Sequence, residues 1–184
     1  ATEASVPIVT VTGDIPMVVA AVASHLAAVA AYEARSTLLV DGDPSTSAIA
    51  SVLQLDSDAG LLAVLSNRMD LSAAIVSTTV GRDRPLDVLP SGHGRIGTVS
   101  PEAVEKVHDI LARMERRYDF MVIAVPSSYA QLVTNTIIPA PDVIVCAQVG
   151  ATRIADLRTA VKSLRSAGKV VHGIVLWDDE APRV

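Results

Sequence analysis

The stretch from Val6 to Asp43 constrains the fold of this chain more than any other part of the sequence. An apolar run, Ile8–Val11, ends shortly before Gly13, and a long helical stretch rich in alanine and valine follows. A second apolar run, Thr37–Val40, then ends on two aspartates. This order predicts a strand, a short loop, a helix and a second strand, which is the unit that cradles phosphates in nucleotide-binding α/β folds.

The remainder of the chain continues the same alternation of strand-length apolar runs and helix-period stretches. The expected strands are Ile8–Val11, Thr37–Val40, Leu86–Leu89, Phe120–Val125, Val143–Gln148 and Val171–Leu176. The expected helices are Pro16–Ala34, Ser45–Leu53, Gly60–Leu65, Leu71–Ser77, Pro101–Arg117, Ala130–Ile138 and Arg153–Ala167. Most of the strands are continuous Val/Ile/Leu runs, which predicts burial on both faces. We therefore expect one doubly wound α/β domain over residues 1–184, with a mostly parallel sheet and helices on both faces.

The composition fits this fold and excludes some functions. Half of the 184 residues are apolar but only 3% are aromatic, so the core must consist mainly of small aliphatic side chains. The net charge of −5, without a basic run, argues against nucleic acid as a partner. The single cysteine, Cys146, excludes a disulfide framework and favours a cytoplasmic setting. We expect no signal peptide and no transmembrane helix, because Met17–Tyr32 is too short and too rich in alanine.

The first loop has the frame of a phosphate loop but not its chemistry. The motif G-x-x-x-x-G-K-[ST] supplies a glycine for close backbone approach, a lysine for the phosphates and a hydroxyl for magnesium. Counted from Gly13, the chain places Val18, Val19 and Ala20 at these positions. A triphosphate would then meet only backbone N–H groups and a helix dipole equivalent to about half a charge. We expect a plain strand-to-helix turn, with Val18 and Val19 stabilising the domain if they are buried.

Two aspartates follow the second strand, and two interpretations of them stay open. Asp41 and Asp43 lie where ligands bind at the carboxyl ends of parallel strands, so a cation could be held there without a nucleotide. In the simpler interpretation, Asp43 and Ser45 cap the next helix while Asp41 accepts hydrogen bonds from loop amides. No metal site is expected elsewhere, because none of the four histidines has a partner at metal-ligand spacing.

Two further stretches lack the residues that a nucleotide site needs. A phosphate-loop protein carries an aspartate for magnesium near the end of the strand that corresponds to Phe120–Val125, and Ala124 occupies that place. Gly92–Gly97 matches the pattern G-x-G-x-x-G, but it does not follow the first strand and does not run directly into a helix. We therefore expect no catalytic residues and no dinucleotide site in this chain.

Five segments, in order, resemble a known family. They are Leu38–Asp43, similar to a second Walker motif; Gly60–Leu65 with Leu71–Ile75, similar to a Gly-Leu-x-x-x-Leu segment; Leu86–Gly92; Arg117–Phe120; and Gly173–Leu176. Together they resemble the cytoplasmic domain of bacterial tyrosine kinases that control capsule and exopolysaccharide chain length, in the ParA/MinD-like branch of phosphate-loop ATPases. Relative to that family, Val19 replaces the Walker lysine, Ala20 the hydroxyl residue, Ala124 the Walker B aspartate and Trp177 an asparagine that faces the base.

The resemblance implies a degenerate member of the family that keeps Gly13, Asp41 and Asp43 but needs no cofactor. Such a domain would be a structural or regulatory partner in exopolysaccharide or capsule biosynthesis or export, without ATP hydrolysis. Its partner would be an inner-membrane polysaccharide co-polymerase or a related export protein, at the cytoplasmic face of the membrane. The domain itself could also form a homo-oligomer.

Two alternatives remain open from the sequence. One is a ParA/MinD-like positioning or scaffold protein that acts through protein contacts. The other is a tyrosine autokinase or ATPase with an unusual site for ATP and magnesium, in which a lysine comes from a partner or from Lys106, Lys162 or Lys169.

Overall fold

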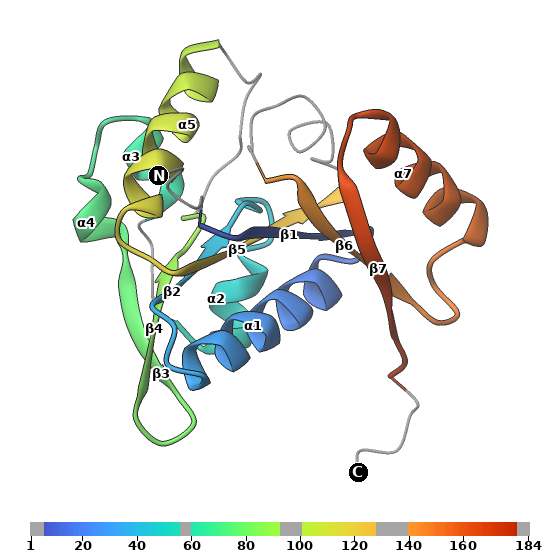
Figure 1. The fold of residues 1–184 in the computed structure, drawn as a ribbon, viewed down its shortest axis with the longest axis horizontal. Coiled ribbons are helices and arrows are strands. Elements are labelled where there is room, and N and C mark those ends of the chain that lie inside the picture. Colours follow the sequence, from blue (N-terminus) through green and yellow to red (C-terminus); the bar gives the residue numbers. More distant parts are fainter. Residues whose placement is uncertain (1–5, 56–59, 93–100, 128–139, 180–184) are drawn as a thin grey trace, which may run out of the picture.

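A seven-stranded sheet in the order β3-β4-β2-β5-β1-β6-β7 forms the centre of the molecule (Figure 1). The structure is a computed structural model that describes residues 6–55, 60–92, 101–127 and 140–179. The strands are β1 Ile8–Gly13, β2 Thr37–Asp41, β3 Val76–Val80, β4 Arg84–Leu89, β5 Phe120–Pro126, β6 Asp142–Gln148 and β7 Val170–Trp177. The helices are α1 Pro16–Tyr32, α2 Ala48–Leu53, α3 Leu61–Leu65, α4 Leu71–Ala74, α5 Pro101–Glu115 and α7 Ile154–Ser166. All paired strands are parallel except β3 and β4, which confirms the predicted doubly wound α/β fold.

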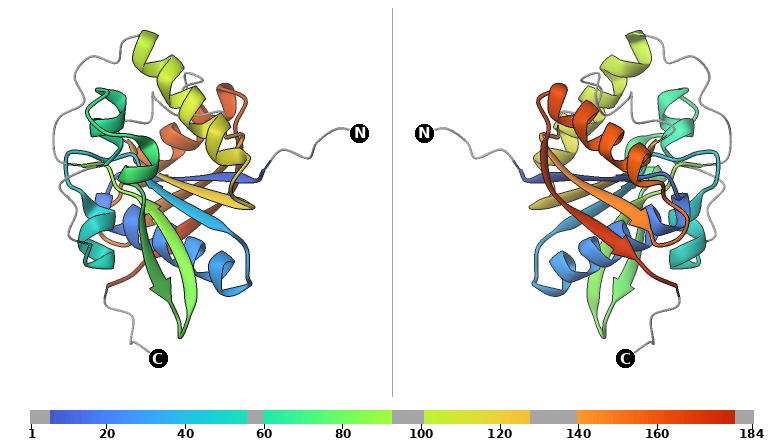
Figure 2. Two further views of the ribbon diagram at one scale, coloured as in Figure 1. Left: turned by 90° about the vertical axis from the view of Figure 1, so that its left-hand side faces the viewer. Right: turned by 90° about the vertical axis from the view of Figure 1, so that its right-hand side faces the viewer.

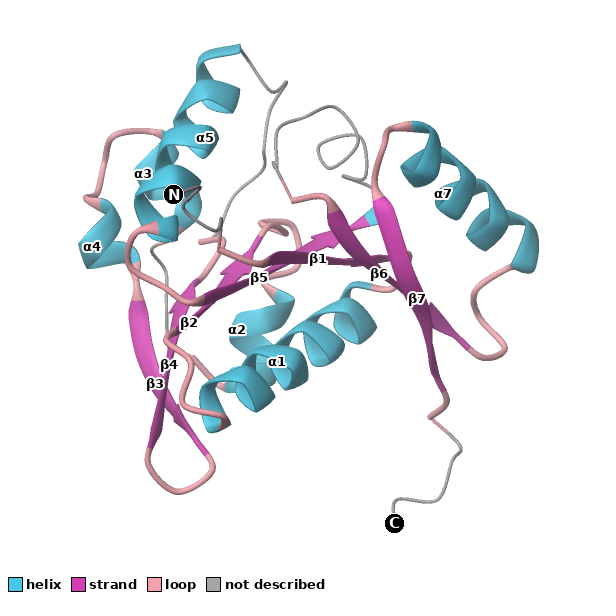
Figure 3. Cartoon of the chain, viewed as in Figure 1, coloured by secondary structure: helices cyan, strands magenta, loops and turns pink. Residues whose placement is uncertain are grey.

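Helices cover both faces of the sheet, as Figure 3 shows. Helices α1 and α2 pack on one face around a cluster that includes Val11, Leu39 and Val122. Helices α3, α4, α5 and α7 pack on the other face around a second cluster that includes Leu38 and Met121. Because neighbouring residues of β2 and β5 belong to opposite clusters, these strands need apolar side chains at every position, as their sequences have. None of the helices in the described ranges is long and apolar enough to cross a membrane.

The antiparallel strand β3 was not expected from the sequence. Leu71–Ser77 was predicted as one helix, but α4 ends at Ala74 and β3 begins at Val76. The strand pairs with β4 through a turn at Gly81, where φ is +62°. Exposed and half-buried residues alternate along it, as expected for an edge strand with one covered face.

The loop after β2 also differs from the prediction. The helix expected over Ser45–Leu53 begins only at Ala48, because Ser47 adopts a left-handed conformation with φ 49° and ψ 41°. The predicted helix Ala130–Ile138 lies outside the described residues.

The strand order brings distant parts of the sequence to one edge of the sheet. Strand β1 lies between β5 and β6, and the parallel strands β1, β2, β5, β6 and β7 all end at this edge. From β1 the chain moves towards β2, whereas from β5 it crosses over β1 to β6. The order therefore reverses at β1, which is where open α/β sheets bind ligands.

Candidate functional site

The residues singled out from the sequence converge at the carboxyl edge of the sheet. Gly13 ends β1 opposite Cys146, and Asp41 ends β2 opposite Ala124. Trp177 ends β7 and packs against the same hydrophobic cluster as Ala124. These positions thus lie along one edge of the sheet, although more than 160 residues separate Gly13 from Trp177 in the chain.

Gly13 is required by its packing contacts. A Cβ atom at this position would lie 2.6 Å from the carbonyl oxygen of Cys146 and 3.1 Å from Cγ2 of Val19. A contact of 2.6 Å with backbone is closer than side chains tolerate, so β1 and β6 can approach each other only with glycine here. The close approach of β6 and of α1 to this position explains the glycine without a phosphate.

Helix α1 begins only three residues after Gly13. Backbone amides that would point at the ligand in a phosphate loop are therefore hydrogen-bonded within the helix. Ile15 is the extended N-cap residue, and Pro16 occupies the first turn, where a proline lacks the N–H that would need a partner. The N–H groups of Val18 and Val19 both donate to the carbonyl oxygen of Ile15, each over 3.1 Å. Only Asp14 and Ile15 lie between β1 and α1. The frame of eight residues is therefore mostly helix.

The three residues that stand where glycine, lysine and a hydroxyl residue would be are buried. Val18, Val19 and Ala20 are 5%, 1% and 2% exposed. They belong to the cluster that also contains Ala124 and Cys146. This apolar packing occupies the space between the first turn of α1 and the sheet.

Asp41 is a buried carboxyl group held by its neighbours. Its Oδ1 accepts a hydrogen bond from the N–H of Asp43 over 2.9 Å, and its Oδ2 accepts one from the hydroxyl of Ser91 over 3.2 Å. Burial raises the pKa of Asp41 from 3.8 to about 6, although these hydrogen bonds oppose the shift. The expectation that Asp41 accepts hydrogen bonds from loop amides is confirmed.

Asp43 organises the turn that follows β2. It is 3% exposed, and its carboxylate accepts hydrogen bonds from the N–H and hydroxyl of Ser45 and from the hydroxyl of Thr46. The carbonyl oxygen of Asp43 accepts the N–H of Ser47, the residue that precedes α2. The expectation that Asp43 and Ser45 cap α2 is thus wrong in detail, because they form a side-chain-stabilised turn ahead of the N-cap.

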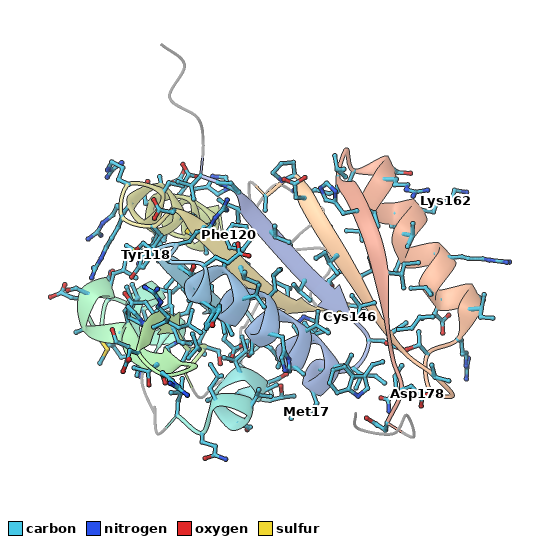
Figure 4. The ribbon with its side chains drawn as sticks, turned by 60° about the horizontal axis from the view of Figure 1, so that its bottom comes forward. Met17, Tyr118, Phe120, Cys146, Lys162 and Asp178 are labelled. Atoms are coloured by element: carbon cyan, nitrogen blue, oxygen red, sulfur yellow. The ribbon has the colours of Figure 1, made fainter. Side chains whose placement is uncertain are left out.

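The three lysines of the chain lie away from the first turn of α1. Lys106 donates to the carbonyl oxygen of Leu65 over 2.8 Å, and Lys169 donates to that of Ala140 over 3.0 Å. Lys162 projects from the outer side of α7 (Figure 4). None of the three stands in for the lysine of a phosphate loop within this chain.

A cavity of about 560 Å³ opens beside this edge, between the ends of β1 and β6 and helix α7. Its described lining includes the carboxylates of Asp14 and Asp156 and no lysine or arginine. Asp14 accepts a hydrogen bond from Thr152 over 2.8 Å. Thr12 also lines the cavity, and its buried hydroxyl has no hydrogen-bond partner among the described residues. Such a lining does not attract a triphosphate, and no pattern in the sequence had predicted this cavity.

The described residues offer no cluster of three or more His, Cys, Asp or Glu side chains that could hold a metal ion. Burial raises the pKa of the Cys146 thiol to about 12, so it stays protonated at neutral pH and is a poor nucleophile. His172 contacts Asp142 at 2.6 Å at the start of β7, far along the strands from the carboxyl edge.

Comparison with known proteins gives a family and a set of similar structures. Residues 19–170 match the protein family described as the AAA domain. A search of curated proteins finds no significant match.

Solved structures share the fold along most of the chain. The chimerical protein CapA2B2 is 21% identical with a TM-score of 0.78, covering 99% of this chain and 79% of that chain. The kinase domain of the Escherichia coli tyrosine kinase ETK is 21% identical with a TM-score of 0.74, covering 100% and 72%. The septum site-determining protein MinD from Pyrococcus horikoshii, solved with Mg-ADP, is 22% identical with a TM-score of 0.71, covering 93% and 70%. The resemblance to tyrosine kinase domains and MinD-like ATPases is confirmed at the level of the fold.

Replacing Val19 with lysine tests whether the filled loop stabilises the domain. The substitution removes about 1.5–3 kcal/mol of apolar burial and places an ammonium group in an apolar cluster. We expect Val19→Lys to lower the urea midpoint by an amount equivalent to at least about 2 kcal/mol. Val29→Lys, on the same helix at a position 58% exposed, is the matched control and should change little. Equal midpoints for Val19→Lys and wild type would contradict this role.

The buried Asp41 should leave a mark on the pH dependence of stability. Because its pKa is about 6 in the folded state and 3.8 when unperturbed, the folded protein binds the proton more tightly. Its contribution to the free energy of unfolding should therefore fall by about 3 kcal/mol as the pH rises from 4 to 6, and then level off. Asp41→Asn should remove this part of the slope in urea titrations between pH 4 and 7.5. Parallel curves for wild type and variant would show that Asp41 has an ordinary pKa.

Proposed function

The chain belongs to the AAA domain family, and from this premise we propose that it is a degenerate kinase- or ATPase-like domain that works without hydrolysing ATP. It acts as a structural or regulatory partner in the biosynthesis or export of a bacterial exopolysaccharide or capsule. The observation that carries the proposal is the start of α1, where Val18 and Val19 are buried and their amides bind Ile15. No catalytic residue and no resident cofactor are needed for this role.

Loss of nucleotide binding follows from what a phosphate would meet at this edge. The family relatives of known chemistry use backbone amides, a lysine and a magnesium ligand. Here the amides of Val18 and Val19 are engaged within the helix, and the lysine position holds Val19. The acidic side chains at this edge, Asp14, Asp41 and Asp43, accept hydrogen bonds from the protein itself. An anionic ligand would have to displace these contacts and would gain no cation in return.

The proposed polysaccharide context rests on the family resemblance of two stretches. Gly60–Ile75 and Leu86–Gly92 resemble the tyrosine kinase branch more than the positioning ATPases. The Gly60 region is built into the fold, because the N–H of Leu61 donates to the carbonyl oxygen of Pro90 over 2.7 Å. We propose an inner-membrane polysaccharide co-polymerase as the partner, contacted at the cytoplasmic face of that membrane.

A thermal melt tests the nucleotide part of the proposal directly. A ligand at a hundred times its dissociation constant would stabilise the fold by about 2.7 kcal/mol. For a domain of this size that corresponds to a shift of about 5–10 °C. We expect no shift with millimolar Mg-ATP or Mg-ADP. A clear shift, or ATP hydrolysis that Asp41→Ala abolishes, would overturn the degenerate assignment.

Genetic complementation tests the polysaccharide part. Deleting the gene should change the amount or chain length of the surface polysaccharide, measured by gel electrophoresis of the extracted polymer. Wild type and Asp43→Asn should restore it equally if no nucleotide chemistry is involved, provided that both proteins accumulate to the same level. An unchanged polysaccharide in the deletion strain would contradict the context and favour a positioning role. Failure of Asp43→Asn alone, with normal protein levels, would point to surviving chemistry at the site.

A further inference from the structure

Strand β7 is a long edge strand whose outer side has no partner among the described residues. It pairs with β6 on one side only, and it ends the order of the sheet. The right-hand view of Figure 2 shows β7 crossing this open edge beside α7. The opposite edge strand, β3, carries Ser77, Thr78 and Thr79 and is shorter, and short edge strands resist pairing with other chains. Strand β7 carries Ile174 and Leu176 instead.

The free backbone groups of β7 can be assigned from its ladder. The N–H of Val149 donates to the carbonyl oxygen of Trp177 over 2.8 Å, so the backbone of Trp177 faces β6. Along a strand, successive residues direct these groups to opposite sides. The N–H and C=O of Ile174 and Leu176 therefore point outward, away from β6. A register shift near the start of the strand confines this regular edge to Gly173–Trp177.

An apolar groove lies between α7 and this part of β7. Ile174 and Leu176 lie on the face that α7 covers, and they are 46% and 66% exposed. Ile174 lines the groove, of about 720 Å³, together with Leu157 and Val161. Ile154 also lines it and is 69% exposed.

The rim of this groove is basic in an otherwise acidic protein. Arg158, Lys162 and Arg165 line it at helical spacing and are exposed. No carboxylate in the described part of the chain forms an ion pair with any of the three. Five basic residues and one acidic residue lie between 153 and 169, whereas the whole chain carries −5.

We propose that the α7–β7 surface (Ile154, Arg158, Lys162, Arg165, Ile174 and Leu176) binds an acidic, extended segment of a partner protein. The segment adds to β7 as an eighth strand. It hydrogen-bonds to the outward backbone groups, and its side chains on the face towards α7 place apolar groups in the groove and carboxylates against the three cations. The surface contains no residue of the filled nucleotide site, so this inference stands or fails separately from the proposed function.

Two other occupants fit these observations less well. A lipid surface would match the cations and the apolar side chains, but it offers no ladder of donors and acceptors for the edge of β7. A second copy pairing antiparallel through β7 would bring two α7 helices together on one face. Its two sets of Arg158, Lys162 and Arg165 would then repel each other.

Binding of short labelled peptides, measured by fluorescence anisotropy, tests the proposal. The probe is an eight-residue peptide with threonine at every second position and valine and glutamate in turn at the others, so that the valines and glutamates share one face of the strand. Its controls carry lysine for glutamate or N-methylated backbone amides. We expect the acidic peptide to bind at least tenfold more tightly than either control, and less tightly at high salt.

Two pairs of protein variants separate the backbone and charge contributions. Leu176→Pro removes an outward N–H without breaking the β6–β7 ladder, and Leu176→Ala is its control because it removes the same side chain but keeps the N–H. Lys162→Glu reverses a charge of the surface, and Arg82→Glu makes the same change in the turn at the opposite edge of the sheet. We expect Leu176→Pro to bind at least tenfold more weakly than Leu176→Ala, and Lys162→Glu to bind more weakly than Arg82→Glu.

Equal affinities within both pairs, for variants whose circular dichroism shows them folded, would overturn the proposal. So would failure of the acidic peptide to bind better than the lysine peptide. Binding to vesicles with anionic lipids without peptide binding would assign the surface to a membrane. A dimer in sedimentation that Leu176→Pro alone dissolves would assign it to a second copy, and either result would replace the acidic strand.

Discussion

The contact between Val19 and Gly13 is the constraint on which the centre of this domain depends. Gly13 lets β1 approach the backbone of β6, and the side chain of Val19 lies 3.1 Å from the place where a Cβ would be. This contact joins α1 to the most central part of the sheet. A lysine at position 19 could reach a phosphate only by leaving this packing. In this structure the side chain of Val19 fills that space as part of the core.

Once α1 is fixed in this way, the polar groups at the edge are arranged around the protein itself. Asp41 binds the amide of Asp43 and the hydroxyl of Ser91, so it connects the ends of β2 and β4. Asp43 in turn shapes the path into α2. In a working nucleotide site such carboxylates would be kept available for a metal or a water molecule. Here they function as parts of the scaffold, which is consistent with a domain that acts through its surface.

The sequence predicted much of this arrangement because the strongest signals in it are local. Continuous apolar runs identified the strands that are buried on both faces, and a motif frame of fixed spacing identified Gly13, Val18, Val19 and Ala20 as neighbours. Strand β3 was missed because Ser77, Thr78 and Thr79 are polar and come only a few residues after α4. The hydrogen bond between Ser91 and Asp41 joins residues 50 positions apart, and no local pattern encodes it. No local pattern encodes the two hydrogen bonds that the Ile15 carbonyl oxygen accepts either, because they depend on where α1 begins.

The position of β1 in the sheet also governs how the chain must be assembled. Its partners are β5 and β6, so residues 8–13 pair with residues 121–126 and 142–146. During synthesis β1 therefore leaves the ribosome long before its two strand partners. Contacts of such sequence separation slow folding and leave apolar surface open to other chains meanwhile. Helix α1 can pack early against β2 and α2, which follow it directly in the chain, whereas β1 has no strand partner until β5 and β6 have been made.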